Sequence, residues 1–334
     1  MKILIIRFSS TGDIVLTTPV IRCIKTQIDQ AEVHVATKKE YAFLMEENPY
    51  IIKTHILDKT LKSLITELKK EKFDLVIDLH KNLRTALIKL RLDIRSRTFD
   101  KLNFQKWLLT AFKINVLPNQ HIVDRYMQSV ESFGVKMDNL GLDYFIPDRD
   151  HVEIDWLPEA FQNGYVAVVI GGQFATKKLP KDRLIELCDR INKPVILLGG
   201  KEEEQMGREI EEFFKPKNDQ FTEGLKALGK QTIVFNTCGK FNFNQSASLI
   251  KQSRWVFTHD TGLMHVAAAF KKEIYSIWGN TIPEFGMYPY RTKFVIFEKK
   301  DLKCRPCSKI GFEKCPKGHF KCMNEVKFDF YLPD

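Results

Sequence analysis

Short apolar runs alternate with longer amphipathic stretches along most of this chain of 334 residues, and no other feature constrains its fold as strongly. The short runs are rich in Val and Ile and almost continuously apolar, as expected for parallel strands buried on both faces. The longer stretches repeat apolar residues at helical spacing. We therefore predict an α/β fold in which helices cover parallel sheets. The predicted strands are residues 2–7, 32–36, 73–78, 95–99, 165–170, 194–198, 232–236, 255–258, 273–278 and 294–298, and the predicted helices are residues 14–28, 61–70, 83–92, 122–133, 182–191, 202–214, 244–251 and 262–270.

The alternation stops between residues 134 and 164, where Asp, Pro, Asn and Gly accumulate as in a connection between domains. A chain of this length is expected to form about two domains of roughly 150 residues. We predict two doubly wound, Rossmann-like domains, residues 1–150 and 151–334, that face a central cleft. Ligands of such sheets bind beyond the carboxyl ends of the strands. The residues that follow each strand are therefore the first candidates for a functional site.

Positive charge is concentrated in one part of the chain, whose formal net charge is +10. Such a concentration favours an anionic partner, either nucleic acid, a phosphorylated lipid or a membrane surface. The alternative is a solvated helix face without a ligand. No apolar run approaches the ~18 residues needed to cross a bilayer, which predicts a cytoplasmic protein. Between residues 81 and 113 the basic residues are Lys81, Arg84, Lys89, Arg91, Arg95, Arg97, Lys101, Lys106 and Lys113, and only Asp93 and Asp100 oppose them.

A small polar turn follows the first predicted strand and contains Ser10, Thr11, Gly12 and Asp13. Gly12 permits a tight turn, and the small hydroxyl side chains leave backbone N–H groups accessible. Asp13 lies at the start of the next helix, where an acidic side chain commonly caps the helix. The alternative is a carboxylate at the mouth of the cleft that accepts a proton from a substrate hydroxyl.

Two further turns, both in the second half of the chain, carry groups that suit an anion or a sugar. After the strand at 165–170 come two glycines, the hydroxyl of Thr176 and Lys177, which form a candidate phosphate cradle. After the strand at 194–198 comes an acidic helix start that includes Glu203. Acidic residues at this position usually interact with the helix dipole, but one can also bind a ribose or sugar hydroxyl.

The most specific segment follows the strand at 255–258 and begins with Asp260. Here a strand ends in Asp-Thr-Gly, and a helix then begins with a histidine, His265, in its first turn. The backbone N–H groups at Thr261, Gly262 and Leu263 are free at the positive end of the helix dipole, so they form a candidate anion site. A lone histidine is more often structural than functional, but this one lies beside the anion site.

These segments resemble glycosyltransferase family 9, the ADP-heptose:lipopolysaccharide heptosyltransferases. The resemblance implies a GT-B fold and an inverting transfer that requires no metal or other cofactor. It implies that Asp13 is the general base and that Lys177 and the backbone at residues 261–263 hold the diphosphate. The resemblance also places four further residues in the donor site, namely Thr176, Glu203, Asp260 and His265. The matching segments, in the family's order, are Gly12-Asp13, Thr17-Thr18-Pro19, Lys177-x-x-Pro180, Asp260-Thr261-Gly262-Leu263-Met264-His265-x-Ala267-Ala268-Ala269 and Trp278-Gly279-x-Thr281.

The resemblance also gives the basic segment a partner, because the inner core of lipopolysaccharide carries carboxylates and phosphates. The implied partners are ADP-heptose and this anionic acceptor, and no nucleic acid is expected. Peripheral contact with the inner face of the inner membrane is a further expectation, because Trp107, Leu108, Leu109 and Phe112 lie beside Lys106 and Lys113. A buried core helix is the alternative for that piece. The predicted acceptor-binding residues are Ser10, Thr11, Gly12, Arg84, Arg91, Arg95 and Arg97.

Four of the seven cysteines form a tail, Cys304-x2-Cys307-x7-Cys315-x6-Cys322, with His319 nearby. Four thiolates can close a structural zinc site, although the second pair lacks the usual close spacing. The alternatives are reduced thiols packed in an irregular tail, or a disulfide formed only after oxidation.

Two functional hypotheses of different classes remain. The first is the heptosyltransferase, or a transferase that uses another nucleotide sugar. The second is a catalytically silent two-domain protein that binds nucleotide or anionic glycan. A silent binder is free to lose Asp13, so the presence of Asp13 together with Lys177, Asp260 and His265 favours the enzyme.

Overall fold

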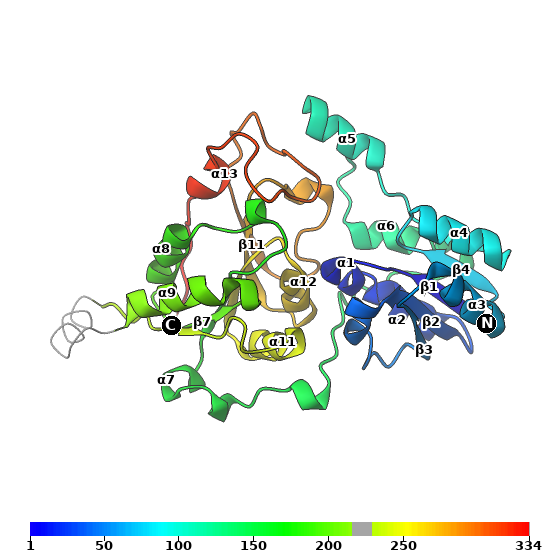
Figure 1. Ribbon diagram of the computed structural model, residues 1–334, viewed down its shortest axis with the longest axis horizontal. Helices are drawn as coiled ribbons and strands as arrows, with labels where there is room; N and C mark the ends of the chain where they lie inside the picture. Colours follow the sequence, from blue (N-terminus) through cyan, green and yellow to red (C-terminus); the bar gives the residue numbers. More distant parts are fainter. Residues whose placement is uncertain (216–228, 334) are drawn as a thin grey trace.

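The computed structural model describes residues 1–215 and 229–333, which contain two parallel sheets side by side (Figure 1). The N-terminal sheet has the strand order β3-β2-β1-β4-β5, so the chain reverses its winding direction between β1 and β4. Its strands are β1 (Lys2–Ile6), β2 (Glu32–Lys38), β3 (Lys53–Leu57), β4 (Leu75–Asp78) and β5 (Ser96–Thr98). Its helices are α1 (Thr11–Val15), α2 (Thr18–Gln27), α3 (Leu61–Glu71), α4 (Leu83–Leu92), α5 (Asn103–Phe112) and α6 (Ile122–Gln128).

The C-terminal sheet has the order β11-β10-β9-β6-β7-β8, and its winding reverses between β6 and β9. The strands that pair directly in this sheet are parallel, as β1, β2, β3, β4 and β5 are in the first. Its strands are β6 (Val166–Val169), β7 (Val195–Leu198), β8 (Val234–Asn236), β9 (Trp255–His259), β10 (Glu273–Trp278) and β11 (Phe294–Glu298). The helices are α7 (Glu159–Gln162), α8 (Lys181–Ile191), α9 (Glu204–Phe214), α11 (Phe243–Gln252), α12 (Gly262–Ala269) and α13 (Lys321–Asn324).

The predicted α/β class with two doubly wound sheets is confirmed, and each predicted strand corresponds to an observed one. Strand β3 was not predicted. Its sequence, Lys-Thr-His-Ile-Leu, is largely polar because β3 is an edge strand that is only partly buried. The helix predicted at 14–28 is two helices, α1 and α2. The first starts earlier than predicted because Ser10 and Asp13 form a capping box, and Pro19 lies in the first turn of the second.

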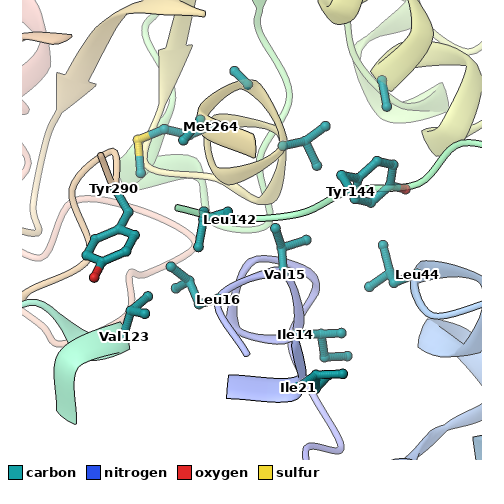
Figure 2. Close-up of a cluster of buried hydrophobic side chains, with 14 of the residues drawn as sticks. Ile14, Val15, Leu16, Ile21, Leu44, Val123, Leu142, Tyr144, Met264 and Tyr290 are labelled. Atoms are coloured by element: carbon teal, nitrogen blue, oxygen red, sulfur yellow. The ribbon is translucent and has the colours of Figure 1, made fainter. Parts of the chain in front are cut away.

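The two halves share one hydrophobic core rather than touching only at their surfaces. Figure 2 shows Val15 of α1 and the next residue, Leu16, near Met264 of α12, with Leu142 and Tyr144 between the two halves. Leu142 and Tyr144 belong to the stretch predicted as the linker, which therefore packs tightly although it forms no strand. The predicted boundary between residues 150 and 151 stays a prediction. Among the described residues, no helix is long and apolar enough to span a membrane.

Candidate functional site

A cavity of about 570 Å³ lies between the two sheets, and most of the predicted site residues line it. Strands β9, β6 and β7 are neighbours in the C-terminal sheet, so the turns at their carboxyl ends meet at one edge. The turn after β1 faces this edge from the N-terminal sheet. The predicted residues that line the cavity are Ser10, Thr11, Gly12, Asp13, Lys177, Glu203, Asp260, Thr261, Gly262, Leu263 and His265.

Asp13 is held in place through both of its carboxylate oxygens. Its Oδ1 lies 2.6 Å from Nη2 of Arg7, and its Oδ2 accepts hydrogen bonds from the backbone N–H (3.2 Å) and the hydroxyl (2.9 Å) of Ser10. Burial acts to raise the pKa of Asp13, but the Arg7 guanidinium and the two Ser10 donors outweigh it, so the pKa lies below its usual value. The side chain still exposes 21% of its surface and lines the cavity. Asp13 therefore caps α1 and also presents an ionised carboxylate to the cavity.

Arg7, which sequence reasoning missed, is fixed from several sides. It is buried at the carboxyl end of β1, donates to the Tyr126 hydroxyl at 3.0 Å, and also binds the Leu79 carbonyl. Its Nε donates to the Ser9 carbonyl at 2.7 Å. A guanidinium in this position keeps the charge and the orientation of Asp13 constant. A charged residue at the end of an otherwise apolar strand is the sequence signal that marks it.

Lys177 and Asp260 form an ion pair on the opposite wall of the cavity. The Lys177 Nζ lies 2.6 Å from the Asp260 Oδ2, which also accepts a hydrogen bond from the Thr281 hydroxyl at 3.0 Å. Both side chains are largely buried, at 16% and 10% exposure. The pair positions one cationic group at the edge of the C-terminal sheet, and Thr281 belongs to the last of the segments quoted for the family resemblance.

Helix α12 begins directly against α1, with glycines on both sides. A Cβ atom at Gly262 would lie 2.9 Å from Thr11 Cγ2, and one at Gly12 would lie 2.7 Å from His265 Cδ2. Burial lowers the pKa of His265 to about 4, so this ring is neutral at pH 7, and its Nδ1 has no partner among the described residues. The two glycines let the N-terminus of α12 approach Asp13 closely.

Of the two predicted donor-site residues Glu203 and Thr176, only Glu203 lies at the cavity. Glu203 lines the cavity, pairs with Lys178 at 2.9 Å and accepts from the Gly200 N–H at 3.0 Å, as the acid of a capping box does. Thr176 is buried and does not line the cavity. Its hydroxyl instead exchanges hydrogen bonds with the backbone of Phe312, which attaches the C-terminal tail to the turn that carries Lys177.

Two lysines that were not on the predicted site list also line the cavity. Lys106 comes from α5 and Lys309 from the cysteine-rich tail. Burial and the nearby Arg125 charge lower the pKa of Lys106 to about 8. Arg125 itself is buried and donates through Nη2 to the Phe285 carbonyl at 3.1 Å, whereas its Nε and Nη1 have no partner among the described residues. Lys106 and Lys309 thus add two cations to a cavity that also contains Asp13, Glu203 and the Lys177–Asp260 pair, and these two cations suit an anionic ligand group.

The four arginines predicted to bind the acceptor do not line the cavity. Arg84 and Arg91 lie on α4, and the guanidinium groups of Arg95 and Arg97 lie over the Phe133 ring at 4.6 and 5.8 Å from its centroid. Their role in acceptor binding stays a prediction.

The cysteine tail contributes Lys309 and Ile310 to the cavity, but its thiols are not gathered into a metal site. The four tail cysteines are free, and the Cys304 Sγ lies 3.8 Å from Nε2 of His319. Within the described part of the chain, no three ligand atoms of this tail lie within 4.8 Å of one another. As placed, the four thiols do not fit a closed tetrahedral zinc site, and the predicted zinc is not confirmed.

Comparison with known proteins identifies the family. Residues 61–316 match the model of glycosyltransferase family 9 (heptosyltransferase). The chain is 25% identical over 310 residues to lipopolysaccharide heptosyltransferase 1 of Campylobacter coli, an alignment that covers 84% of each chain. It is 24% identical over 308 residues to lipooligosaccharide heptosyltransferase 2 of Haemophilus ducreyi, which covers 85% of each.

Solved structures show the same fold. The Escherichia coli ADP-heptose lipopolysaccharide heptosyltransferase II aligns with a TM-score of 0.68 at 18% identity, covering 97% of this chain and 98% of that one. The E. coli heptosyltransferase WaaC with ADP aligns with a TM-score of 0.62 at 19% identity, covering 89% of this chain and 93% of the other. The predicted GT-B fold is thereby confirmed.

Proposed function

The chain belongs to glycosyltransferase family 9 (heptosyltransferase), and we propose that it transfers heptose from ADP-heptose to the inner core of lipopolysaccharide, with inversion and without a metal. One observation carries the proposal. A single cavity has a cation and a helix N-terminus on the wall from the C-terminal sheet, and an ionised carboxylate on the wall from the N-terminal sheet.

The wall from the C-terminal sheet suits the diphosphate of the donor. The first backbone N–H groups of α12, at residues 261–263, carry the positive end of the helix dipole, and Lys177 adds a full charge beside them. As the bond between the sugar and ADP breaks, negative charge develops on the leaving diphosphate, and these groups stabilise it. Asp260 orients Lys177, and Glu203 is positioned to accept a hydrogen bond from a hydroxyl of the donor.

Asp13 is assigned the role of the general base. The acceptor hydroxyl attacks the anomeric carbon from the face opposite to ADP, the bond from that carbon to the diphosphate oxygen breaks, and the hydroxyl proton passes to Asp13. A carboxylate with a lowered pKa is a weak base, so the proton moves only as the attacking oxygen becomes acidic in the transition state. The fixed contacts to Arg7 and Ser10 keep the carboxylate ionised and correctly oriented for this step.

On the acceptor side, two lysines line the cavity together with Asp13. Lys106 and Lys309 are assigned to a carboxylate or phosphate of the acceptor, next to the turn of Ser10, Thr11 and Gly12. We assign the four predicted acceptor-binding arginines to anionic groups farther along the same acceptor; they are Arg84, Arg91, Arg95 and Arg97. An acceptor anchored to lipid places the reaction at the cytoplasmic face of the inner membrane.

Release of ADP tests the proposed substrates. Wild-type protein is incubated with ADP-heptose, and separately with other nucleotide sugars, each with and without a Kdo-containing lipid acceptor. We expect ADP release that requires both ADP-heptose and the acceptor. Release from a different nucleotide sugar would overturn the donor assignment, and binding of ADP-heptose without any release would support the silent binder instead.

A further inference from the structure

Two buried histidines and a carboxylate meet in the N-terminal half of the protein, outside the cavity. His34 of β2 and His55 of β3 are fully buried, and the His34 Nδ1 lies 3.0 Å from the His55 Nε2. One ring nitrogen of each histidine and one carboxylate oxygen of Glu71, the last residue of α3, lie within 4.8 Å of one another. We call His34, His55 and Glu71 the β2–β3 cluster. None of the three lines the cavity, and Figure 1 shows α3 on the side of the N-terminal half that is remote from the C-terminal half.

Two neighbouring strands and one helix bring the β2–β3 cluster together. His55 pairs with Ala36, two residues after His34, so both rings lie on the same face of the sheet. Helix α3 covers that face, and its residues Glu67 and Glu71 are four positions apart, so they lie on one side of the helix. The two rings stack with their centroids 5.2 Å apart. Their positions are therefore determined by the backbone and by packing.

A chain of hydrogen bonds determines which ring nitrogens carry a proton. The Glu67 carboxylate can only accept, and it lies 2.6 Å from the His55 Nδ1, so this nitrogen carries the proton. Burial lowers the pKa of both histidines, so both rings are neutral at pH 7. The His55 Nε2 is then a bare acceptor, and the proton in the 3.0 Å contact belongs to the His34 Nδ1. The chain ends at the buried His34 Nε2, which has no hydrogen-bond partner among the described residues.

This arrangement has the features of a metal-binding histidine and its support. A histidine that binds a metal usually donates its other N–H to a carboxylate, as His55 does to Glu67. Zn–N bonds of about 2.0–2.1 Å at a tetrahedral angle place two nitrogen ligands about 3.3–3.4 Å apart. The two facing nitrogens reach that separation if the rings move apart by roughly 0.3 Å. When an ion binds there, the proton of the His34 Nδ1 passes to the Nε2 of the same ring, which no other group occupies.

The charged groups around the β2–β3 cluster are mainly carboxylates. Glu71 accepts hydrogen bonds from Lys53 at 2.6 Å through Oε1 and from Lys2 at 3.2 Å through Oε2, and each oxygen keeps a second lone pair for a ligand. These two ammonium groups lower the pKa of Glu71 to about 2, so its carboxylate is ionised at neutral pH. Glu32 pairs with Lys2 and Glu67 pairs with Lys53, both at 3.6 Å. Three carboxylates therefore surround the cluster against two ammonium groups, and this excess favours a cation.

From these observations we propose that the β2–β3 cluster binds one zinc ion through a ring nitrogen of His34, the Nε2 of His55 and a carboxylate oxygen of Glu71. Two imidazoles and one carboxylate form a ligand set that suits Zn²⁺, and water takes the fourth position of a tetrahedral ion. The site lies outside the cavity, so the ion takes no part in sugar transfer. It connects the edge strand β3 to β2 and to the end of α3. A hydrogen-bond network without a metal would use the same side chains, and the measurements below distinguish the two.

Zinc binding is measured without any sugar substrate, so the failure of this proposal and that of the transferase proposal are distinguishable. Because the thiolates of the tail also bind zinc, the double variant Cys304→Ser and Cys307→Ser is measured beside the wild type. Both proteins are freed of metal with EDTA, desalted and titrated with Zn²⁺ in competition with a chromophoric chelator. We expect the double cysteine variant to bind one equivalent of zinc and to melt at a higher temperature with zinc than in EDTA.

Substitutions in the double cysteine variant then test the ligands. His55→Gln should abolish zinc binding and the rise in melting temperature. Glu67→Gln should weaken binding about 10–100-fold, because the carboxylate that orients His55 is lost. Glu71→Gln removes a proposed ligand rather than its support, so it should weaken binding more than Glu67→Gln. Glu67 and Glu71 are partly exposed, so both of these variants should fold, and the melting temperature in EDTA checks this.

Matched controls and a second metal make the test independent of any one variant. His319→Gln removes an exposed imidazole of the tail, and Glu46→Gln removes an exposed carboxylate, so both should leave the zinc affinity of the double cysteine variant unchanged. Titration with Co²⁺ distinguishes the ligands in the wild type, because nitrogen and oxygen ligands give visible d–d bands without the charge-transfer band of a thiolate. We expect such d–d bands in the wild type and their loss in His55→Gln.

Three results would overturn the inference. The first is a double cysteine variant that binds no zinc, or binds it only in large excess. The second is zinc binding that His55→Gln or a folded Glu71→Gln variant leaves unchanged. The third is a cobalt spectrum that shows thiolate ligation alone. In each case the β2–β3 cluster is a hydrogen-bond network that holds β3 in place without a metal.

Discussion

The close approach of α1 and α12 makes Gly12→Ala the most informative perturbation of this protein. The new Cβ would lie 2.7 Å from His265 Cδ2, 3.3 Å from His265 Nε2 and 3.4 Å from Gly262 Cα. Carbon atoms in contact prefer about 3.5–4.0 Å. The His265 ring is buried, and the other neighbour is backbone, so neither yields easily. The two helices must therefore separate by roughly 1 Å.

This separation moves Asp13 relative to the wall that holds Lys177 and the N-terminus of α12. Overpacking of this kind costs about 1–3 kcal/mol of folding free energy. A misplacement of about 1 Å at a reacting centre can cost about 10²-fold in rate. The proposed diphosphate contacts all lie on the C-terminal half, so the Kd for ADP-heptose should change by only a few fold while kcat falls about 10²-fold.

The assay compares kcat, the Kd for ADP-heptose by calorimetry and the melting temperature. Gly207→Ala is the matched control, because its Cβ would lie 2.2 Å from Asn236 Oδ1, a clash between α9 and β8 within the C-terminal half. That variant should lower the melting temperature and leave kcat of the folded protein nearly unchanged. Wild-type kcat in Gly12→Ala, or an equal loss of kcat and donor affinity, would contradict this prediction.

Two further variants test the charged walls of the cavity. With the pKa of Lys106 at about 8, its ammonium is charged below that pH and neutral above it, so KM for an anionic acceptor should rise as pH increases through 8. Arginine stays charged, so Lys106→Arg should abolish this rise, and an unchanged pH profile would contradict the assignment. Lys177→Ala removes the cation beside the proposed diphosphate and leaves Asp260 without its partner, so kcat should fall about 10²–10³-fold. A smaller loss than in Lys178→Ala, whose Nζ pairs with Glu203, would show that Lys177 is not the diphosphate ligand.

The sequence was sufficient to predict those parts of the fold that depend on the local pattern of apolar and polar residues. Buried parallel strands such as β6 and β7 are continuously apolar, and the turns after them carry the residues that line the cavity. Strand β3 was missed because an edge strand is only half buried and reads as polar. The start of α1 was misplaced because its cap depends on the contact between Ser10 and Asp13.

Apart from Arg7, the missed site residues come from elements distant in sequence from the turns that carry the motifs. Lys106 and Lys309 reach the cavity from α5 and from the cysteine tail, and no spacing in the sequence places these two beside Asp13. The excess of basic residues between 81 and 113 did indicate an anionic partner, but it did not distinguish Lys106, which faces the cavity, from Arg84 and Arg91, which face solvent. That distinction depends on which face of each helix packs against the rest of the molecule.

The most direct test of the proposed mechanism is a comparison of donor binding and turnover in Asp13→Asn. This variant removes the charge and keeps the shape of a side chain that caps α1. We predict a Kd for ADP-heptose within about threefold of wild type and a loss of acceptor-dependent ADP release of about 10²–10⁴-fold, the usual contribution of a general base. Full turnover in Asp13→Asn at saturating donor would contradict the central claim, because the carboxylate on the N-terminal wall would then take no part in the reaction.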